Sequence, residues 1–384
     1  MDLDKLIDRF PSVSYLEEQA PRSIPHFAWE YLASGTGLET GVALNCQALQ
    51  QVRFIPRLMQ DRARPDLAVT VLGKRFAAPI GMAPIGLGGA MWPGAERILA
   101  ATARRFDIPY CLSTVACDTP EAIGSVAGDN GWFQLYTLKD KQIELDIVER
   151  AWNSGFKVLM VTVDVPENST RERQRKAGMR GSAGSSASRL MQVLERPQWA
   201  MAAARNGAPG FRTLEKYAGS KSLQAQSVFL GGQNLGEISF EHLKVLRERW
   251  KGKLVIKGLM HGDDAQKAIE IGADGIVVSN HGARQSDGTL ASIDVLQSIS
   301  RAVDGRIAVI FDSGIRTGLD VMRALALGAD MVLCGRAFMF GVAALGEQGG
   351  DVTAKILIDD LENNMIQIGA SKAGELAGML AARN

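Results

Sequence analysis

Short apolar runs recur along the chain, and amphipathic stretches separate them. A short continuous apolar run is typical of a strand that is buried on both faces, as in a parallel sheet. Eight such runs stand in the sequence: Ala77–Ala83, Pro109–Ser113, Trp132–Tyr136, Val158–Asp164, Leu254–Lys257, Gly275–Ser279, Ile307–Asp312 and Met331–Gly335. Amphipathic helices are predicted between most of them: Ala95–Phe106, Lys141–Trp152, Phe240–Trp250, Asp263–Ile271, Ile293–Val303 and Gly318–Leu327. This alternation predicts successive βα units.

An internal repeat supports that prediction. The segment Ala268–Val278 reads AIEIGADGIVV, and Ala324–Cys334 reads ALALGADMVLC. Each copy ends a helix, stops at a glycine and begins a strand. Eight strands that alternate with helices favour a closed (β/α)8 TIM barrel, of the α/β class, over an open sheet. A dinucleotide-binding open sheet would carry an early GxGxxG, and the glycines at positions 81, 86, 88 and 89 do not fit that spacing.

Two regions fall outside the repeat. We expect residues 1–70 to form an N-terminal helical extension over one mouth of the barrel, and residues 71–384 to form the barrel itself. Residues 166–236, after the fourth strand, are far longer than a usual connection. One interpretation of this insert is a mobile lid with a short helix. The other is a peripheral membrane patch, because arginines at 189, 196 and 205 flank Leu, Met and Trp residues, although Pro197 interrupts any long helix.

Composition narrows the functional classes. The chain has 43 basic and 42 acidic residues, a net charge of +1, so no nucleic-acid-binding field is expected. Its four cysteines show no metal-ligand spacing, and we expect buried thiols in a reducing compartment and no metal site. No apolar stretch is long enough to span a bilayer, and the first residues lack a signal core. These features predict a cytoplasmic protein.

Polar side chains stand where the predicted strands end, and catalytic groups of parallel barrels gather at the carboxyl ends of the strands. The sixth run leads directly into the segment 279–285, Ser-Asn-His-Gly-Ala-Arg-Gln. Of the four histidines, only His281 stands at a clear strand end. An imidazole near the guanidinium of Arg284 suits removal of a proton beside a bound acid group. Asp164, at the end of the fourth strand, is the natural carboxylate to orient the imidazole.

Other strand ends indicate an anionic ligand. The turns after the seventh and eighth strands pair Gly314 with Arg316 and Gly335 with Arg336, as phosphate sites of barrels do. Lys257 ends the fifth strand, where a buried ammonium group is costly unless an anion faces it. This lysine fits either a Schiff base with a carbonyl substrate or the stabilisation of negative charge on a cofactor.

At these residues the chain resembles the FMN-dependent (S)-2-hydroxy acid oxidases and dehydrogenases, over almost its whole length. The family's Ser-Asn-His-Gly-Gly-Arg-Gln appears with Ala283 in place of the second glycine, and its Asp-Gly-Gly-(Val/Ile)-Arg turn appears with Ser313 as its second residue. Three shorter matches are Gln134-Leu135-Tyr136, Thr162-Val163-Asp164, and Tyr31 ahead of Ala33-Ser34-Gly35.

The resemblance implies a role for each matching residue. His281 would take a proton from the substrate, and Asp164 would balance the charge that it acquires. Arg171 and Arg284, assisted by Tyr31, would hold the substrate carboxylate, while Tyr136 would bond the 2-hydroxyl or nascent keto oxygen. Lys257 would stabilise the reduced flavin, which displaces the Schiff-base role. The residues expected around FMN are Ala83, Pro84, Ile85, Ser113, Gln134, Thr162, Lys257, Ser279, Asp312, Gly314, Arg316, Gly335 and Arg336.

The resemblance also bears on substrate and electron acceptor. Gly86 stands where the oxidases of the family usually carry alanine and the dehydrogenases glycine, although lactate monooxygenase shares the glycine. The segment 178–212 is similar to the insert of bacterial membrane-associated L-lactate dehydrogenases, which implies quinone reduction at the inner membrane, with oxygen as the alternative acceptor. The stretch Gly88–Pro93 looks like the (S)-mandelate enzyme, and Val115 in place of a bulky tryptophan implies room for more than a two-carbon acid. The family is usually tetrameric, so a homotetramer is expected.

Two other functions remain open from the sequence. The first is a non-redox barrel enzyme that uses Lys257 as a Schiff base on a sugar phosphate. The second is a catalytically silent barrel that serves as a binding scaffold.

Overall fold

Eight parallel strands close into a barrel, which confirms the predicted architecture. The computed structural model describes residues 2–59, 64–179, 186–233 and 238–382. In hydrogen-bonded order the barrel runs β10-β3-β4-β5-β6-β7-β8-β9. Its strands are β3 (Ile80–Met82), β4 (Tyr110–Ser113), β5 (Gly131–Tyr136), β6 (Val158–Thr162), β7 (Lys253–Leu259), β8 (Gly275–Val278), β9 (Ala308–Asp312) and β10 (Met331–Cys334). Each falls on one of the eight apolar runs.

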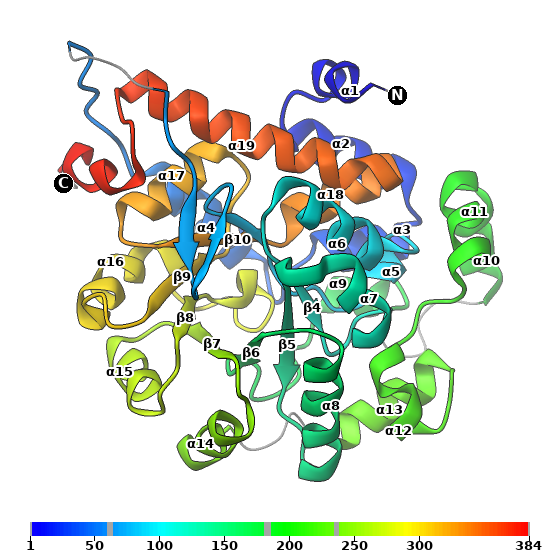
Figure 1. Ribbon diagram of the computed structural model, residues 1–384. Coiled ribbons are helices and arrows are strands. Elements are labelled where there is room, and N and C mark those ends of the chain that lie inside the picture. Colours follow the sequence, from blue (N-terminus) through cyan, green and yellow to red (C-terminus); the bar gives the residue numbers. More distant parts are fainter. Residues whose placement is uncertain (1, 60–63, 180–185, 234–237, 383–384) are drawn as a thin grey trace.

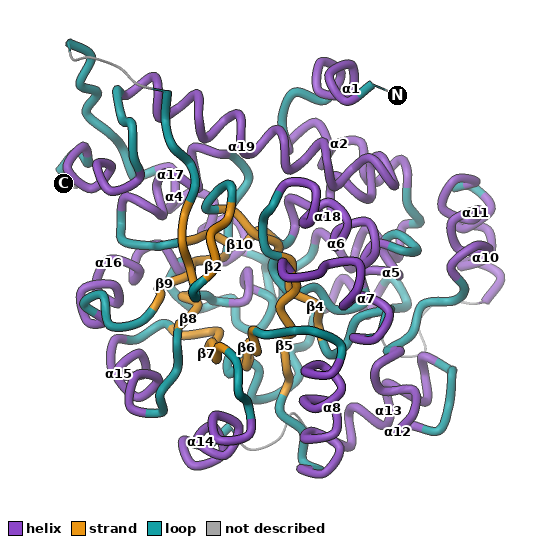
Figure 2. Tube along the Cα trace, in the orientation of Figure 1, coloured by secondary structure: helices purple, strands orange, loops and turns teal. Residues whose placement is uncertain are grey.

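Helices surround the strands, as Figures 1 and 2 show. The barrel helices are α6 (Ala95–Phe106), α7 (Pro120–Ala127), α8 (Lys141–Asn153), α14 (Phe240–Arg249), α15 (Gly262–Glu270), α16 (Ser292–Val303), α17 (Gly318–Ala326) and α18 (Arg336–Leu345). All six predicted helices are confirmed to within a residue at each end. Local capping explains two of the starts: Asp140 accepts from the backbone of Gln142 and Ile143, and Thr317 forms a capping box with Asp320.

Shorter elements and one long helix complete the barrel domain. They are α5 (Gly88–Met91), η1 (Gly128–Asn130), η3 (His281–Ala283), η4 (Gly346–Gln348), α19 (Gly349–Ile368) and η5 (Ala373–Met379). The long helix α19 crosses the outer side of α17 and α18 (Figure 1).

The N-terminal extension is helical over a shorter range than expected. Its helices are α1 (Leu3–Arg9), α2 (Val13–Ser23), α3 (His26–Ala33) and α4 (Thr40–Gln50). Residues 51–59 and 64–68 contain no helix. The helix α3 lies at the carboxyl mouth of the barrel, because the hydroxyl of Tyr31 donates to the carbonyl of Gly86, after β3, over 3.1 Å.

A small hairpin covers the opposite mouth. Its strands are β1 (Val69–Val71) and β2 (Lys74–Phe76), joined by a two-residue turn in which Leu72 and Gly73 both have positive φ. Phe76 packs edge-on against Trp132 at a ring distance of 6.2 Å, and the two belong to the cluster that fills the barrel interior. Lys74 donates to Asn130, just before β5, over 3.0 Å. The hairpin therefore closes the amino ends of the strands.

The insert after β6 contains several helices rather than a single short one. They are α9 (Glu172–Lys176), α10 (Ser186–Leu194), α11 (Pro197–Asn206), η2 (Arg212–Leu214), α12 (Glu215–Ala218) and α13 (Leu223–Gln233). Pro197 begins α11, so the predicted interruption is confirmed. Part of the Ser-, Ala- and Gly-rich stretch, residues 180–185, lies outside the described residues. In Figure 1, α10 and α11 stand out from the edge of the barrel.

Candidate active site

His281 and Asp164 meet at the carboxyl mouth of the barrel. Asp164 follows β6 and His281 follows β8, and Nδ1 of the imidazole lies 2.8 Å from Oδ1 of the carboxylate. An ionised carboxylate only accepts hydrogen bonds, so Nδ1 is the protonated nitrogen and Nε2 keeps a free lone pair. Burial lowers the pKa of His281, and the field of Lys257 adds to this, while Asp164 opposes it. The pair is thus an ionised acid that orients a neutral imidazole.

The carboxyl of Asp164 is kept ionised although it is buried. Burial alone would raise its pKa, but His281 and Lys257 outweigh this effect and hold the pKa below its ordinary value. Its second oxygen, Oδ2, lies 3.8 Å from Nζ of Lys257 and is buried with no hydrogen-bond partner.

Lys257 lies inside the barrel between two carboxylates. Its Nζ is 3.2 Å from Oδ2 of Asp312 and donates to Oγ of Ser279 over 2.9 Å. Burial lowers the pKa of this lysine, but Asp312 and Asp164 together raise it above its ordinary value. A Schiff base requires a neutral amine, so a permanently charged lysine suits electrostatic stabilisation instead.

Two arginines face the same mouth without a carboxylate partner. Arg171 donates to the side chains of Gln285 over 2.8 Å and Ser169 over 3.0 Å. Arg284 donates to the carbonyls of Tyr31 over 2.9 Å and Leu32 over 2.7 Å, at the end of α3. Within the described part of the chain, neither guanidinium has an acidic group within 4.0 Å. Burial, and then the neighbouring Arg171, lower the pKa of Arg284 to about 10, so it stays charged at neutral pH.

Tyr31 and Tyr136 lie beside these arginines. The guanidinium of Arg284 stands 5.9 Å from the ring centre of Tyr31. Tyr136, the last residue of β5, is close enough to Asp164, Arg171 and Lys257 to feel their charges. Burial, followed by Asp164, raises the pKa of Tyr136 to about 12, so its phenol remains a hydrogen-bond donor at neutral pH.

A row of polar side chains crosses three neighbouring strands inside the mouth. The hydroxyl of Ser113 donates to Oε1 of Gln134 over 2.7 Å, and Nε2 of Gln134 donates to Thr162 over 3.0 Å. Ala83, Pro84 and Ile85 follow β3, and the backbone of Ala83 bonds to Cys334 of β10. The row and this turn offer a polar edge and an apolar support to a planar ligand.

The expected phosphate end lies after β9 and β10. Gly314 has a φ of +91°, and a Cβ there would stand 2.7 Å from the carbonyl of Asn45, so a side chain is not accommodated. Arg316 lies 3.7 Å from Glu17. Arg336, which follows Gly335, donates to the carbonyls of Gly282 over 3.0 Å and Ser34 over 2.8 Å. Burial, and then Arg284 and Arg316, lower its pKa well below the ordinary value.

The residues present fit FMN. Arg336 Nε and Asp164 Oδ2 are buried without a hydrogen-bond partner. Such orphaned groups are costly unless a ligand completes them. Arg284 and Arg336 are buried cations with no ion pair among the described residues, which suits a phosphate and a carboxylate. All residues expected at the site from the sequence therefore lie on the loops and strand ends of one mouth, as predicted; their individual roles stay predictions.

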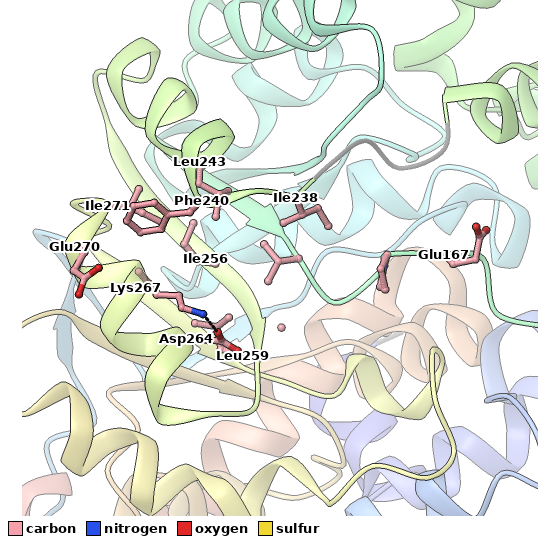
Figure 3. A pocket seen from close by; sticks show the side chains of 14 residues that line it. Glu167, Ile238, Phe240, Leu243, Ile256, Leu259, Asp264, Lys267, Glu270 and Ile271 are labelled. Carbon is pink, nitrogen blue, oxygen red and sulfur yellow. Dashed lines mark hydrogen bonds and ion pairs between the residues drawn. The ribbon is translucent and has the colours of Figure 1, made fainter.

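A cavity of about 890 Å³ lies elsewhere, outside the barrel between β7, α14 and α15 (Figure 3). It is lined by apolar side chains such as Phe240, Leu243 and Ile271, with Asp264 and Lys267 paired at its edge. None of the expected flavin or acid ligands lines it. This cavity is distinct from the candidate site.

The sequence missed several residues that shape the site. Ser169 and Gln285 hold Arg171, and Ser313 accepts from the backbone of Gly282 over 3.0 Å. Gln285 stood in the quoted motif, but the motif gives no contact for it. Gly258 follows Lys257 directly, and only the structure shows what it approaches.

Comparisons with known proteins agree with this geometry. The model of the family described as FMN-dependent dehydrogenase matches residues 20–382. An L-lactate dehydrogenase of Xanthobacter autotrophicus is 37% identical over 368 residues, 95% of each chain. Another of Ectopseudomonas mendocina is 36% identical over 94% of this chain and 96% of its own.

Solved structures of the same fold are also similar. The monotopic membrane protein (S)-mandelate dehydrogenase superposes with a TM-score of 0.91 at 34% identity, covering 96% of this chain and 98% of its own. A mandelate oxidase variant superposes with a TM-score of 0.79 at 31% identity, over 96% of this chain and 97% of its own. With the family matched over nearly its whole length and the FMN-binding mouth assembled from the matching residues, this chain belongs to the FMN-dependent dehydrogenase family.

Proposed function

We propose that this protein oxidises an (S)-2-hydroxy acid of the lactate or mandelate kind to the 2-keto acid. The observation that carries the proposal is the oriented, neutral imidazole of His281 at a mouth that also holds two buried arginines without acidic partners. The names of the similar proteins, L-lactate dehydrogenase and (S)-mandelate dehydrogenase, support the substrate class.

Arg171 and Arg284 bind the substrate carboxylate in this proposal. Removing a proton next to a carboxylate is difficult because charge builds beside existing charge. Two guanidinium groups neutralise the acid and fix its orientation. Tyr31 assists through its place beside Arg284, and Tyr136 donates to the 2-hydroxyl oxygen.

His281 then accepts the proton at Nε2, because Nδ1 is committed to Asp164. The imidazolium that results is stabilised by the ionised Asp164. FMN supplies the acceptor for the electron pair. Lys257 keeps a positive charge beside the expected flavin ring, and Ser113, Gln134, Thr162 and Ser279 are the groups that would bond that ring.

The decisive test replaces the base. His281→Gln should bind FMN and remain yellow but should lose about 10²–10⁴ in the rate at which an (S)-2-hydroxy acid bleaches the flavin under anaerobic conditions. Unchanged bleaching would remove His281 from this role. A wild-type protein that no (S)-2-hydroxy acid bleaches would favour a silent scaffold instead.

We also propose that the insert brings the enzyme to a membrane, where a quinone takes the electrons. The described part of α10 and α11 exposes Leu190, Met191, Leu194 and Met201 to between 54% and 64%. Arginines at 189, 196 and 205 lie among them. Apolar and basic residues on a surface helix suit an interfacial helix that lies on an anionic membrane. No helix among the described residues is long and apolar enough to cross a bilayer, and the solved (S)-mandelate dehydrogenase is monotopic.

The acceptor and the assembly remain proposals of this kind. Gly86 favours a dehydrogenase, and a Cβ at this position would stand 2.8 Å from Val115, beside the expected flavin. Oxygen is the alternative acceptor, and a rate of reoxidation in air that matches the rate with quinone would favour it. A homotetramer stays a prediction, which sedimentation of the holoenzyme checks.

A further inference from the structure

One glycine of β7 approaches the Asp164–His281 pair more closely than any side chain would allow. In the pairing of β7 with β8, Lys257 lies opposite Val277 and Leu259 lies opposite Val278. Gly258 is therefore an extra residue, a β-bulge, and its φ is +108°. Glycine in a strand often marks a bulge or a close approach of another group.

The group that approaches is Asp164. A Cβ on Gly258 would stand 2.4 Å from Cβ of Asp164, 2.5 Å from its Cγ and 2.7 Å from its Oδ2. No real carbon tolerates these distances, so any side chain at position 258 must move Asp164 or the bulge. The backbones are also tied together here, because the amide of Val163 donates to the carbonyl of Lys257 over 2.9 Å.

Asp164 has little else to hold it. Its Oδ1 bonds to His281, while its Oδ2 has no hydrogen-bond partner and lies 3.8 Å from Lys257. The bulge also ends at the catalytic loop: the carbonyl of Leu259 accepts from Ser279, whose hydroxyl accepts from the amide of His281 and from Lys257. One irregularity of β7 thus touches three of the charged groups at the mouth.

We propose that Gly258 is a positioning residue for the reaction: the bulge, with no side chain, leaves the space in which Asp164 holds His281. This inference rests on the proposed function, but the contact between Gly258 and Asp164 does not. The charged groups that face His281 are Asp164 from the end of β6, Lys257 from β7 and Arg171 from the insert. Moving Asp164 away removes the only one of these that favours a protonated imidazole.

The test compares two glycines of similar backbone conformation. Gly155, before β6, has a φ of +97°, and a Cβ there would meet nothing within 4 Å. Gly155→Ala therefore carries the same backbone strain as Gly258→Ala without the clash. We expect Gly258→Ala to keep FMN and its KM for the acid but to lose about 10² in kcat, the scale of a misplacement of about 1 Å. Gly155→Ala should keep both constants.

A second readout does not depend on activity. The chain has four histidines, so a protein labelled only at histidine gives four imidazole titrations by NMR, and His281→Gln assigns the relevant one. The His281 titration should move to lower pH in Gly258→Ala, toward its position in Asp164→Asn, and stay in place in Gly155→Ala. Wild-type kcat and an unmoved titration in Gly258→Ala would overturn the proposal, as would an equal loss in Gly155→Ala. If no acid bleaches the wild-type flavin, the proposed function fails while the titration still reports on Gly258.

Exchanging the two residues covers the case in which Gly258→Ala does not fold. Asp164→Gly removes the atoms that the new Cβ would strike, so the double variant Asp164→Gly/Gly258→Ala should fold, and the two changes should couple favourably in a double-mutant cycle of unfolding. A double variant that fails to fold, when Asp164→Gly and Gly155→Ala both fold, would refute the steric relation.

Discussion

At the scale of single residues, the reaction depends on the charge of one imidazole. His281 accepts a proton only when it is neutral, and burial, together with Lys257, holds its pKa below the ordinary 6.5. We expect kcat/KM to rise with pH through a midpoint below 6.5 and then to reach a plateau, because Asp164 is ionised over that range. Asp164→Asn should move the midpoint to still lower pH and lower the plateau. His261→Gln, at an exposed histidine, should leave the profile as it is.

The two departures from the family motifs share a backbone feature. Ala283 has a φ of +56° and Ser313 a φ of +89°, conformations that favour glycine. Relief of the strain is worth about 1–2 kcal/mol for either change to glycine. Glycine in turn costs roughly 0.5–1 kcal/mol of chain entropy.

The side chains then decide the sign for each position. Ala283→Gly loses one buried methyl, worth about 0.8 kcal/mol, so urea unfolding should change by less than about 1 kcal/mol. Ser313→Gly also loses hydrogen bonds to Asp312 and from Gly282, each worth roughly 1 kcal/mol, and should be net destabilising. A larger loss in Ala283→Gly than in Ser313→Gly would contradict this reasoning.

Sequence reasoning located the charged residues of the site but not the residues that hold them. His281, Asp164 and Lys257 each stand at the end of an apolar run, where chain direction alone places them at one mouth. Gln285 holds Arg171 across 114 positions of the chain, and Gly258 matters only through what it approaches. Contacts of this kind depend on how loops pack, and no local pattern records them.

At the scale of elements, regular periodicity was sufficient and its absence was not. The strands and barrel helices follow from runs and spacing, whereas residues 51–68 carry no helical pattern and were nevertheless assigned to a helical extension. The hairpin β1–β2 was missed because its strands are only three residues each, too short to show alternation.

The hairpin provides an elementary test of packing. Phe76 is 1% exposed and fills the amino mouth against Trp132. Phe76→Ala should cost about 3–5 kcal/mol of unfolding free energy, as large-to-small core changes do. Arg75→Ala, at the exposed neighbour on the same strand, should change stability by less than about 0.5 kcal/mol. Similar losses in both variants, measured in urea, would mean that the hairpin is not a plug.

At the scale of the whole molecule, the insert and the catalytic mouth are joined. Trp199 of α11 donates to the carbonyl of Met91, next to α5, over 3.0 Å, and packs edge-on against Phe27 of α3. The side chain of Gln192 in α10 accepts from the amide of Phe27. The helix α3 carries Tyr31, so the surface proposed to meet a membrane is one helix away from the expected acid site.

This arrangement separates the two halves of the reaction. Leu190→Ser/Met191→Ser/Leu194→Ser removes exposed apolar surface of α10 that makes no part of the acid site. We expect flavin bleaching by the acid to keep its rate, because His281 and both arginines are untouched. Binding to vesicles of anionic lipid, and reduction of quinone dissolved in them, should be lost. The matched control, Val228→Ser/Val245→Ser, changes exposed apolar residues of α13 and α14 and should bind vesicles like the wild type. If the triple variant still sediments with vesicles, the membrane contact lies elsewhere, and if bleaching slows as well, the insert also shapes the acid site.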